Sequence, residues 1–335
     1  MNKLKIAIAG LGRIGKIHLE NLLQTPNVDI IGVMDPDPDA INYAREKGID
    51  NVFQDYNQLL DLREIHAIVI CTPTNTHADY VEIAAKSGIH VFCEKPLDLN
   101  LNRVLEVLEI VKKSDIKLML GFNRRFDKEF SRVKDSINKG VIGDAHLVKI
   151  TSRDPSPPPV SYIKTSGGLF LDMTIHDFDM ARFLVDKEVE EVYAKGAVLI
   201  DKAISDAGDI DTAVIVLKYS DSSMAIIDNS RKASYGYDQR IEVFGSKGMI
   251  KGNNLLKDNN KIYTEDQISS SLPMNFFLER YSEAYKIEII DFTNAILKNS
   301  SVSVSGDDGL QSLKIGLAAK KSLIENRPVK LDEIK

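Results

Sequence analysis

The first 120 residues alternate short apolar runs with stretches of helical spacing, and this alternation limits the possible folds more than any other feature of the chain. Apolar runs occur at residues 4–9, 29–34, 67–71, 90–93 and 117–120. Between them, residues 14–23, 39–47, 77–86 and 101–113 repeat apolar side chains at helical intervals. Apolar strands that alternate with helices form a parallel sheet covered on both faces. The sequence predicts an α/β fold that begins with a doubly wound, Rossmann-type parallel sheet.

The pattern changes after Gly121. A charged helical stretch at 123–139 leads to a strand at 146–152 and to a proline-rich loop at 154–160, which can form neither regular element. From 188 to 263, strand-like runs follow one another with no helix between them, and helices at 277–297 and 307–325 close the chain. We expect two domains. The first, residues 1–122, is the dinucleotide-binding Rossmann domain. The second, residues 123–335, is an α+β domain with a large, mainly antiparallel sheet for substrate binding and oligomerisation.

Charge and composition exclude several classes of protein. The chain has 43 Lys and Arg against 49 Asp and Glu, a net charge of −6, which disfavours a basic nucleic-acid surface. No apolar run approaches the roughly 18 residues that span a bilayer, and the N-terminus lacks the pattern of a signal peptide. Cys71 and Cys93 lie in apolar runs without a CxxC pair or a histidine at metal-ligand spacing. We expect a cytoplasmic protein without metal, nucleic-acid or membrane partners.

One strand of the second domain predicts self-association. Residues 212–217, with the sequence TAVIVL, are apolar on both faces. Helices of the same domain can cover one face, and a second subunit is a natural cover for the other. We expect a homo-oligomer, a dimer or tetramer, that forms through the C-terminal sheet.

A glycine motif follows the first predicted strand and opens the first helix. Gly10, Gly12 and Gly15 form G-x-G-x-x-G, which suits a tight turn, close approach of a pyrophosphate and close helix packing. The N–H groups at the helix N-terminus would bind the phosphate. Asp35 lies 20 residues after Gly15, where a carboxylate accepts from a ribose and repels a 2′-phosphate. This arrangement favours NAD over NADP, although Asp35 is also a plausible turn residue in MDPDPD.

Two further strand ends carry polar residues that point to the same crevice. Thr72, Asn75 and His77 follow the apolar run at 67–71, at a sheet edge where small polar groups contact a dinucleotide. Thr76 could cap the next helix, and that role is compatible with dinucleotide contacts from Thr72 and Asn75. After the next run, Lys95 is placed to donate to a substrate hydroxyl. Pro96 can fix its backbone, and an X-Pro bond also allows a cis peptide there. A surface lysine is the alternative.

The second half contains GGLFLDMTIHD. On a helix, Asp172 and His176 would stand four residues apart on one face, among apolar neighbours that make isolated charge costly. Polar groups tolerated there point to function, although a lone histidine is more often structural.

These motifs together resemble the Gfo/Idh/MocA oxidoreductases. The stretches GFNRRFD, SRDPSPPP and GGLFLDMTIHDFDMARFL are most similar to the inositol 2-dehydrogenases of that family. The resemblance covers nearly the whole chain and implies NAD-dependent oxidation of myo-inositol to scyllo-inosose in inositol catabolism. A dehydrogenase of another cyclic polyol or aldose, such as scyllo-inositol or glucose, and a non-catalytic NAD-dependent sugar sensor remain as alternatives.

The resemblance also implies site residues. The catalytic set corresponds to Lys95, Asp172 and His176. The residues expected to bind the cofactor are Gly10, Gly12, Arg13, Ile14, Gly15, Asp35, Thr72, Asn75, His77, Glu94 and Lys95. Those expected to bind substrate are Lys95, Arg125, Asp154, Asp172, His176 and Tyr235. Three of these positions have an alternative. Arg125 could form a surface pair or a cofactor contact together with Arg124. Asp154 could be a turn residue, and Tyr235 could lie at a subunit boundary.

The chemistry agrees with this assignment. Oxidation of a secondary alcohol without zinc needs a side-chain base, and an imidazole, with an ordinary pKa of about 6.5, suits His176 for that role. Lys95 would stabilise alkoxide character, and Asp172 would hold Lys95 or a neighbouring hydroxyl in place. The nicotinamide accepts the hydride.

Overall fold

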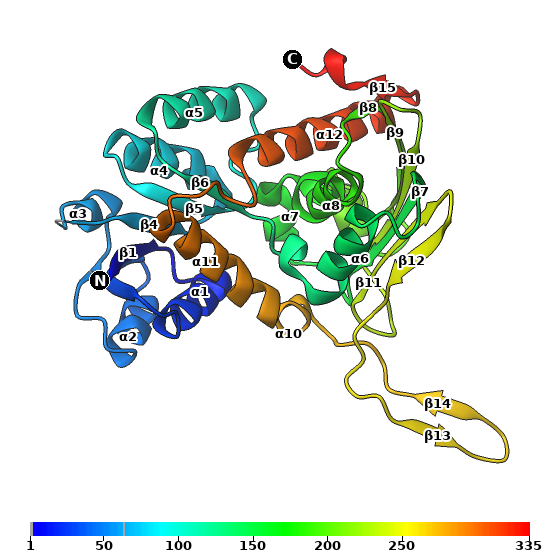
Figure 1. The fold of residues 1–335 in the computed structure, drawn as a ribbon, viewed down its shortest axis with the longest axis horizontal. Coiled ribbons are helices and arrows are strands. Elements are labelled where there is room, and N and C mark those ends of the chain that lie inside the picture. Colours follow the sequence, from blue (N-terminus) through cyan, green and yellow to red (C-terminus); the bar gives the residue numbers. More distant parts are fainter. Residues whose placement is uncertain (1–2, 63) are drawn as a thin grey trace. The chain divides into compact units, whose positions relative to one another are not determined.

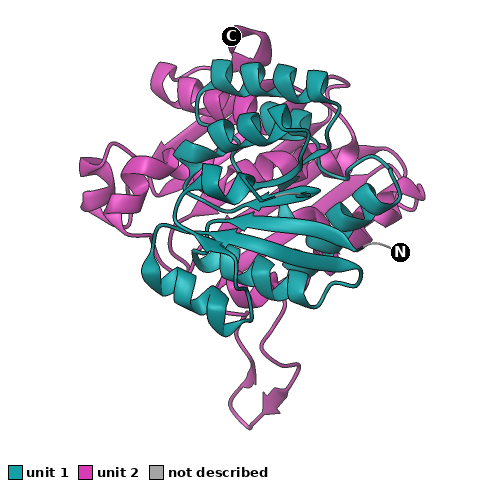
Figure 2. Ribbon diagram, turned by 90° about the vertical axis from the view of Figure 1, so that its left-hand side faces the viewer, with its two compact units in different colours: residues 1–123, 284–311 teal, residues 124–283, 312–335 magenta. Residues whose placement is uncertain are grey.

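The computed structural model describes residues 3–62 and 64–335. The chain divides into two compact units (Figure 2). The first unit comprises residues 1–123 and 284–311, and the second comprises residues 124–283 and 312–335.

The first unit contains a six-stranded sheet with the order β3-β2-β1-β4-β5-β6, in which every neighbouring pair is parallel (Figure 1). Its strands are β1 (Leu4–Ala9), β2 (Val28–Met34), β3 (Val52–Phe53), β4 (Ala67–Ile70), β5 (His90–Glu94) and β6 (Leu118–Gly121). The strand order reverses between β1 and β4, and ligands of open α/β sheets bind at the carboxyl ends beside such a reversal. The predicted doubly wound sheet is confirmed.

The helices of this unit follow the predicted pattern. They are α1 (Arg13–Leu23), α2 (Pro38–Glu46), α3 (Tyr56–Leu60), α4 (Thr74–Lys86) and α5 (Leu101–Ser114). The pattern did not predict β3 and α3, which are too short to show a period.

Residues 284–311, which we assigned to the second domain from sequence, group with the Rossmann sheet. They carry most of α11 (Ser282–Leu297) and the first turns of α12 (Gly306–Glu325). On α11, Phe292 packs edge-on against Phe92 of β5, with ring centroids 5.8 Å apart. The carbonyl of Val304 accepts from the Leu120 N–H at 3.2 Å. The first unit is therefore built from two separate pieces of chain.

The second unit contains a seven-stranded sheet with the order β12-β11-β7-β10-β9-β8-β15. Its strands are β7 (Ala145–Arg153), β8 (Val189–Ala197), β9 (Thr212–Tyr219), β10 (Met224–Ser230), β11 (Asp238–Gly245), β12 (Gly248–Gly252) and β15 (Val329–Lys330). Its helices are α6 (Lys128–Asn138), α7 (Val160–Ser166), α8 (Ile175–Val185), α9 (Lys202–Asp206), α10 (Phe277–Arg280) and the rest of α12. The predicted mainly antiparallel α+β architecture is confirmed.

Two details differ from the prediction for residues 188–263. First, β10 pairs with β7 in parallel, so the sheet is mixed. Second, a short helix, α9, interrupts the strands. The carboxylate of Asp211 accepts from the N–H groups of Leu199, Ile200 and Asp201, and Asp201 caps α9. These contacts fold the β8–β9 connection into a helical loop instead of a plain turn.

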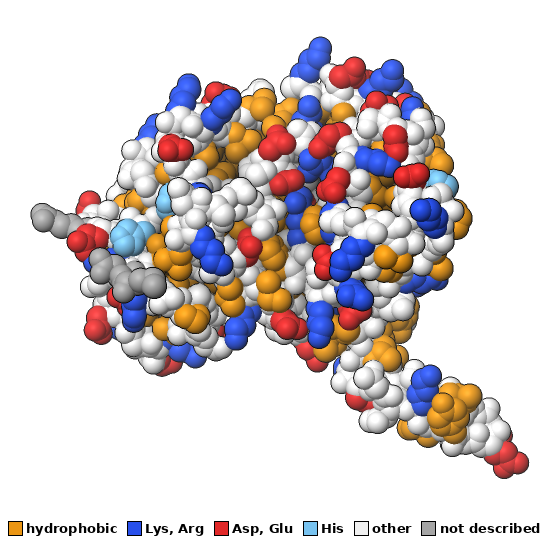
Figure 3. All heavy atoms as spheres, viewed as in Figure 1, with side chains coloured by type: hydrophobic (Ala, Val, Ile, Leu, Met, Phe, Trp, Pro, Cys, Tyr) orange, Lys and Arg blue, Asp and Glu red, His pale blue; other side chains and the backbone are white. Residues whose placement is uncertain are grey.

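A two-stranded hairpin, β13 (Lys261–Tyr263) and β14 (Ile268–Ser270), projects from the second unit (Figures 1 and 3). Its apolar side chains are exposed, with 63% of Ile262 and 69% of Tyr263 accessible. In the described part of the chain, no helix is long and apolar enough to cross a bilayer.

Candidate active site

The glycine turn between β1 and α1 has the shape that a dinucleotide requires. Gly10 has φ +89°, and a Cβ there would lie 2.7 Å from the Cys71 backbone. A Cβ on Gly15 would lie 1.9 Å from the Gly10 carbonyl oxygen, so helix and turn touch. A Cβ on Gly12, which caps α1, would meet nothing within 4 Å. The turn is closed around Gly10 and Gly15 and open at Gly12.

The start of α1 fits a phosphate. Arg13 and Ile14 form its first turn, which has no acidic side chain, so nothing there competes with an anion for the N–H groups. Asp35, just past β2, accepts from the Leu11 N–H at 2.6 Å through Oδ2 and from the Asp37 N–H at 2.9 Å through Oδ1. Asp35 therefore braces the glycine turn, and each of its oxygens keeps a lone pair for a further donor.

The residues after β4 hold one another at the same sheet edge. The Thr76 hydroxyl donates to the Pro73 carbonyl at 2.8 Å and lies 2.6 Å from the Thr72 hydroxyl. The helix cap is Pro73, so Thr76 lies inside α4. His77 is buried, and its ring nitrogens lie 2.8 and 2.7 Å from the carbonyl oxygens of Pro96 and Thr72. Burial lowers the pKa of His77, while both carbonyls oppose the shift. His77 links the two loops of the cofactor edge, and Asn75 is exposed beside it.

Lys95 follows β5, and the Lys95–Pro96 peptide bond is cis. Glu94, the last residue of β5, accepts from His18 of α1 at 2.8 Å. Gly121 of the neighbouring strand leaves room for its carboxylate, because a Cβ there would lie 3.0 Å from the Glu94 carboxyl atoms. The strand end that carries Lys95 is thus fixed by buried side chains.

In the second unit, the segment that carries Asp172 and His176 is helical but differs from the predicted α-helix. Leu169–Met173 forms a π turn, closed by the bond from the Thr174 N–H to the Leu169 carbonyl at 2.9 Å, and α8 starts at Ile175. The Thr174 hydroxyl also reaches the Leu169 carbonyl and the Asn229 side chain, which widens the turn. The segment is therefore not one regular α-helix. π turns are frequent at functional sites.

Asp172 lies in a cluster of polar side chains from distant parts of this unit. Tyr162 of α7 donates to its Oδ1 at 2.9 Å, and Arg231 donates to its Oδ2 at 3.1 Å. Arg231 also donates to Asp154 at 3.2 Å. Burial raises the pKa of Asp154, and Arg231 acts to lower it. Arg231 is only 3% exposed, so it joins two of the predicted substrate carboxylates from inside the unit.

The other predicted residues of this unit are engaged elsewhere. Arg125 forms a bidentate ion pair with Asp179, with distances of 2.8 and 2.5 Å. The buried Arg124 pairs with Asp177 at 2.5 Å. The two arginines are not a surface pair. Tyr235 donates to Asp238 at 2.6 Å and accepts from Arg153 at 3.1 Å.

Our sequence analysis missed Arg231 and Tyr162. Arg231 stands in IDNSRKASYGY, directly after β10, and no motif marks it. Tyr162 follows the proline-rich loop. The position of Arg231 at a strand end was the available signal, since such positions carry ligand contacts in other folds.

Two protein-family models match this chain. Residues 4–122 match the model of the "Oxidoreductase family, NAD-binding Rossmann fold", and residues 130–251 match the "GFO/IDH/MocA C-terminal domain". The chain belongs to the Gfo/Idh/MocA oxidoreductase family. NAD is its cofactor, as the glycine motif predicted, and the open turn at Gly12 with the first turn of α1 fits the pyrophosphate.

Individual relatives of this oxidoreductase are similar over almost their full length. The "Myo-inositol 2-dehydrogenase" of Thermotoga maritima is 47% identical over 332 residues, 99% of each chain. The "Inositol 2-dehydrogenase" of Rhizobium meliloti is 46% identical, covering 98% of this chain and 99% of the relative. The structure of scyllo-inositol dehydrogenase from Lactobacillus casei with bound NAD(H) and scyllo-inositol superposes with a TM-score of 0.92 at 32% identity, covering 98% and 99%.

Proposed function

We propose that this enzyme oxidises myo-inositol to scyllo-inosose in inositol catabolism, with transfer of hydride to NAD. The observation that carries the proposal is the 46–47% identity, over nearly the full chain, to two inositol 2-dehydrogenases. The polar cluster around Asp172 supports it, because a ring with several hydroxyl groups needs several donors and acceptors.

In this proposal Lys95, Asp172 and His176 do the chemistry. His176 takes the hydroxyl proton, and Lys95 donates to the same oxygen and stabilises alkoxide character. Asp172, held by Tyr162 and Arg231, orients Lys95 or a substrate hydroxyl. NAD supplies the hydride acceptor when bound. The glycine turn and Asp35 bind it, together with Arg13, Ile14, Thr72, Asn75, His77 and Glu94. Asp154, Arg125 and Tyr235 complete the proposed substrate set.

The test is a panel of inositols and sugars with NAD, followed by the absorbance of NADH. We expect myo-inositol to have the highest kcat/KM. A large preference for an aldose would contradict the assignment. A preference for scyllo-inositol would support the nearest alternative, which the L. casei neighbour favours. Tight NAD binding without turnover of any polyol would indicate a sugar sensor.

We also propose that the enzyme is a homo-oligomer, a dimer or tetramer, with a second copy covering the outer face of the C-terminal sheet. Cross-strand partners on that face form an apolar row, because Met249 pairs with Phe244, Phe244 with Leu147, and Leu147 with Met224. Phe244 is 50% exposed and Met224 is 47% exposed. Light scattering after size exclusion measures the mass, and a monomer at micromolar concentration would contradict this proposal.

We further propose that the enzyme is cytoplasmic. There the nicotinamide pool is available and the free thiols of Cys71 and Cys93 stay reduced.

A further inference from the structure

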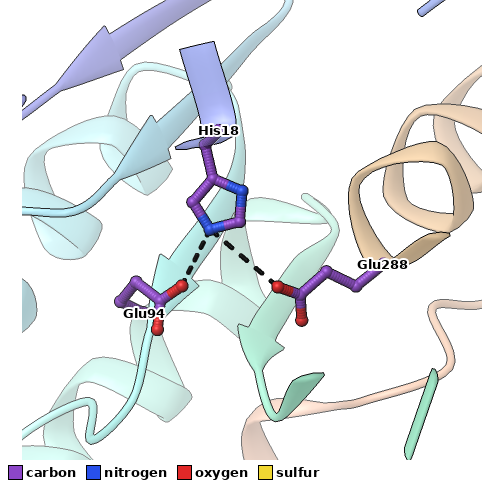
Figure 4. Close-up of side chains that lie close together, drawn as sticks. All are labelled: His18, Glu94 and Glu288. Carbon is purple, nitrogen blue, oxygen red and sulfur yellow. Dashed lines mark hydrogen bonds and ion pairs between the residues drawn. The ribbon is translucent and has the colours of Figure 1, made fainter. Parts of the chain in front are cut away.

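Three ionisable side chains of the first unit lie close together at the end of β5, the strand that precedes Lys95 (Figure 4). They come from three elements: His18 from α1, Glu94 from the end of β5, and Glu288 from α11. His18 Nε2 lies 2.8 Å from Glu94 Oε1 and 3.9 Å from Glu288 Oε1. Figure 4 shows both carboxylates directed toward the same edge of the imidazole.

Glu288 is in an unusual environment for a carboxylate. It is fully buried, and neither of its oxygens has a hydrogen-bond partner among the described residues. Its one ion-pair candidate there is His18, at the long distance of 3.9 Å. An ionised carboxylate that is buried without a good partner is strongly disfavoured, so the protein neutralises it in some way.

A proton or a divalent cation could neutralise this cluster. The ligand atoms of the three residues lie within 4.8 Å of one another, which a cation would tolerate after a small contraction. However, His18 Nε2 already makes a direct hydrogen bond to Glu94. A metal-bound histidine normally gives its other ring N–H to an acceptor, and His18 Nδ1 has no hydrogen-bond partner among the described residues. This geometry favours the proton.

We propose that Glu288 is a neutral carboxylic acid in the folded enzyme, and that His18 is a positioning residue for Glu94. In this arrangement, His18 Nε2 donates to the Glu94 carboxylate. The space left by Gly121 accommodates that carboxylate. Glu94 directly precedes Lys95, so the cluster fixes the backbone from which Lys95 starts. The role toward Lys95 rests on the proposed function, whereas the protonation of Glu288 does not.

The titratable groups around Glu288 act in the direction of the proposal. Burial raises its pKa well above the usual range, and the charge of Glu94 on β5 adds to this. Cys71, just past β4, has its own thiol pKa raised by burial and by the charge of Glu94. Tyr285, one turn earlier on α11, packs edge-on against His18 at 5.8 Å. These surroundings favour the neutral form of the Glu288 carboxyl group.

The first test is an infrared difference spectrum between wild type and Glu288→Gln at about pH 7.5, with 13C-labelled glutamate. We expect the variant to lose the carbonyl band of a protonated carboxylic acid. Glu283→Gln, an exposed glutamate near the start of the same helix, is the matched control and should lose only the band of an ionised carboxylate. Loss of only ionised carboxylate in Glu288→Gln would overturn the proposal. If that variant does not fold, the labelled wild type still shows whether a protonated glutamate is present.

The second test measures unfolding against pH from 5 to 8. The folded wild type holds one proton that its unfolded chain releases, so its unfolding constant should rise about tenfold per pH unit relative to Glu288→Gln, up to the pKa of Glu288 in the folded protein. Equal pH slopes would contradict the proposal. So would calorimetry showing that the wild type binds one equivalent of Zn²⁺ or Mn²⁺ tightly and that Glu288→Gln does not, because the cluster would then be a cation site.

The positioning role has its own measurement. His18→Gln keeps a side-chain N–H that can donate to Glu94, whereas His18→Leu removes the donor. We expect kcat with myo-inositol to be at least about tenfold higher in His18→Gln than in His18→Leu, with both variants folded. Equal kcat values would overturn the positioning role while leaving the infrared result intact. Absence of inositol turnover in wild type would refute the proposed function instead.

Discussion

In the first unit, the candidate cofactor residues follow the ends of successive strands, and the backbone forms much of the site. In the second unit, the candidate substrate residues are held by side chains far apart in the sequence. Asp154 and Arg231 are 77 residues apart, and Asp172 and Arg231 are 59 apart. Substitutions should therefore act differently in the two units. In the first they change how the backbone meets the cofactor, and in the second they break a network or remove a reacting group.

The largest effect is expected for His176→Ala, in the second unit. Loss of a general base usually costs 10² to 10⁴-fold in rate, so we expect kcat to fall by about that factor. The dissociation constant of NAD should stay nearly the same, because the residue lies outside the dinucleotide motifs. Steady-state kinetics and NAD titration measure both quantities.

His146→Ala is a matched control for that variant, since His146 is an exposed histidine of the same unit. The acid limb of the kcat/KM profile should vanish or move only in His176→Ala. A folded His176→Ala enzyme with most of its turnover and an unmoved acid limb would show that another group, first of all Asp172, takes the proton.

Arg231→Gln tests the side-chain network. It leaves two partly buried carboxylates without their cation, and breaking a buried pair costs about 3–5 kcal/mol. Chemical denaturation should show a loss of about that size, and kcat/KM should fall as Asp172 loses its support. Lys218→Gln, an exposed lysine paired with the exposed Glu190, should cost about 1 kcal/mol or less.

The loss in Arg231→Gln should also depend on pH. Arg231 holds down the pKa of Asp154, which burial raises, so removing it should raise that pKa further. An acid whose folded pKa exceeds its unfolded value loses stability as pH rises toward the folded pKa. The difference in unfolding free energy between wild type and Arg231→Gln should therefore be larger at pH 8 than at pH 5. A loss that is equal at both pH values would show that Asp154 is not coupled to Arg231.

Two glycines of the first unit separate folding from binding. Gly15→Ala places a methyl group 1.9 Å from the Gly10 carbonyl, and overpacking of this kind typically costs about 1–3 kcal/mol or more. Gly12→Ala has open space and φ −61°, so its stability should change little while its affinity for NAD falls. Thermal unfolding and NAD titration distinguish the two. Unchanged NAD affinity in Gly12→Ala would contradict approach of the pyrophosphate at this glycine.

The same contrast explains what the sequence could predict. The roles of Gly10, Gly12 and Gly15 follow from local backbone geometry, so a short motif indicates them. The Arg231 network and the Glu288 cluster depend on contacts between distant segments, which leave no periodic pattern. The π turn before α8 depends on Thr174 reaching Asn229, so spacing alone predicted an ordinary helix there.

The smallest effect is expected for Asp35→Ser, which tests whether a side chain also contributes in the unit where the backbone dominates. The serine removes a negative charge that would repel a 2′-phosphate, so NADP use should rise while kcat/KM with NAD falls about tenfold, the loss of roughly one hydrogen bond to a charged group. It also removes the acceptors for Leu11 and Asp37, so a small loss of stability should accompany the change. Asp39→Ser, an exposed carboxylate nearby, should leave the ratio of NAD to NADP use unaltered. If the wild-type enzyme already uses both cofactors with equal kcat/KM, the carboxylate of Asp35 serves the glycine turn and does not select the ribose.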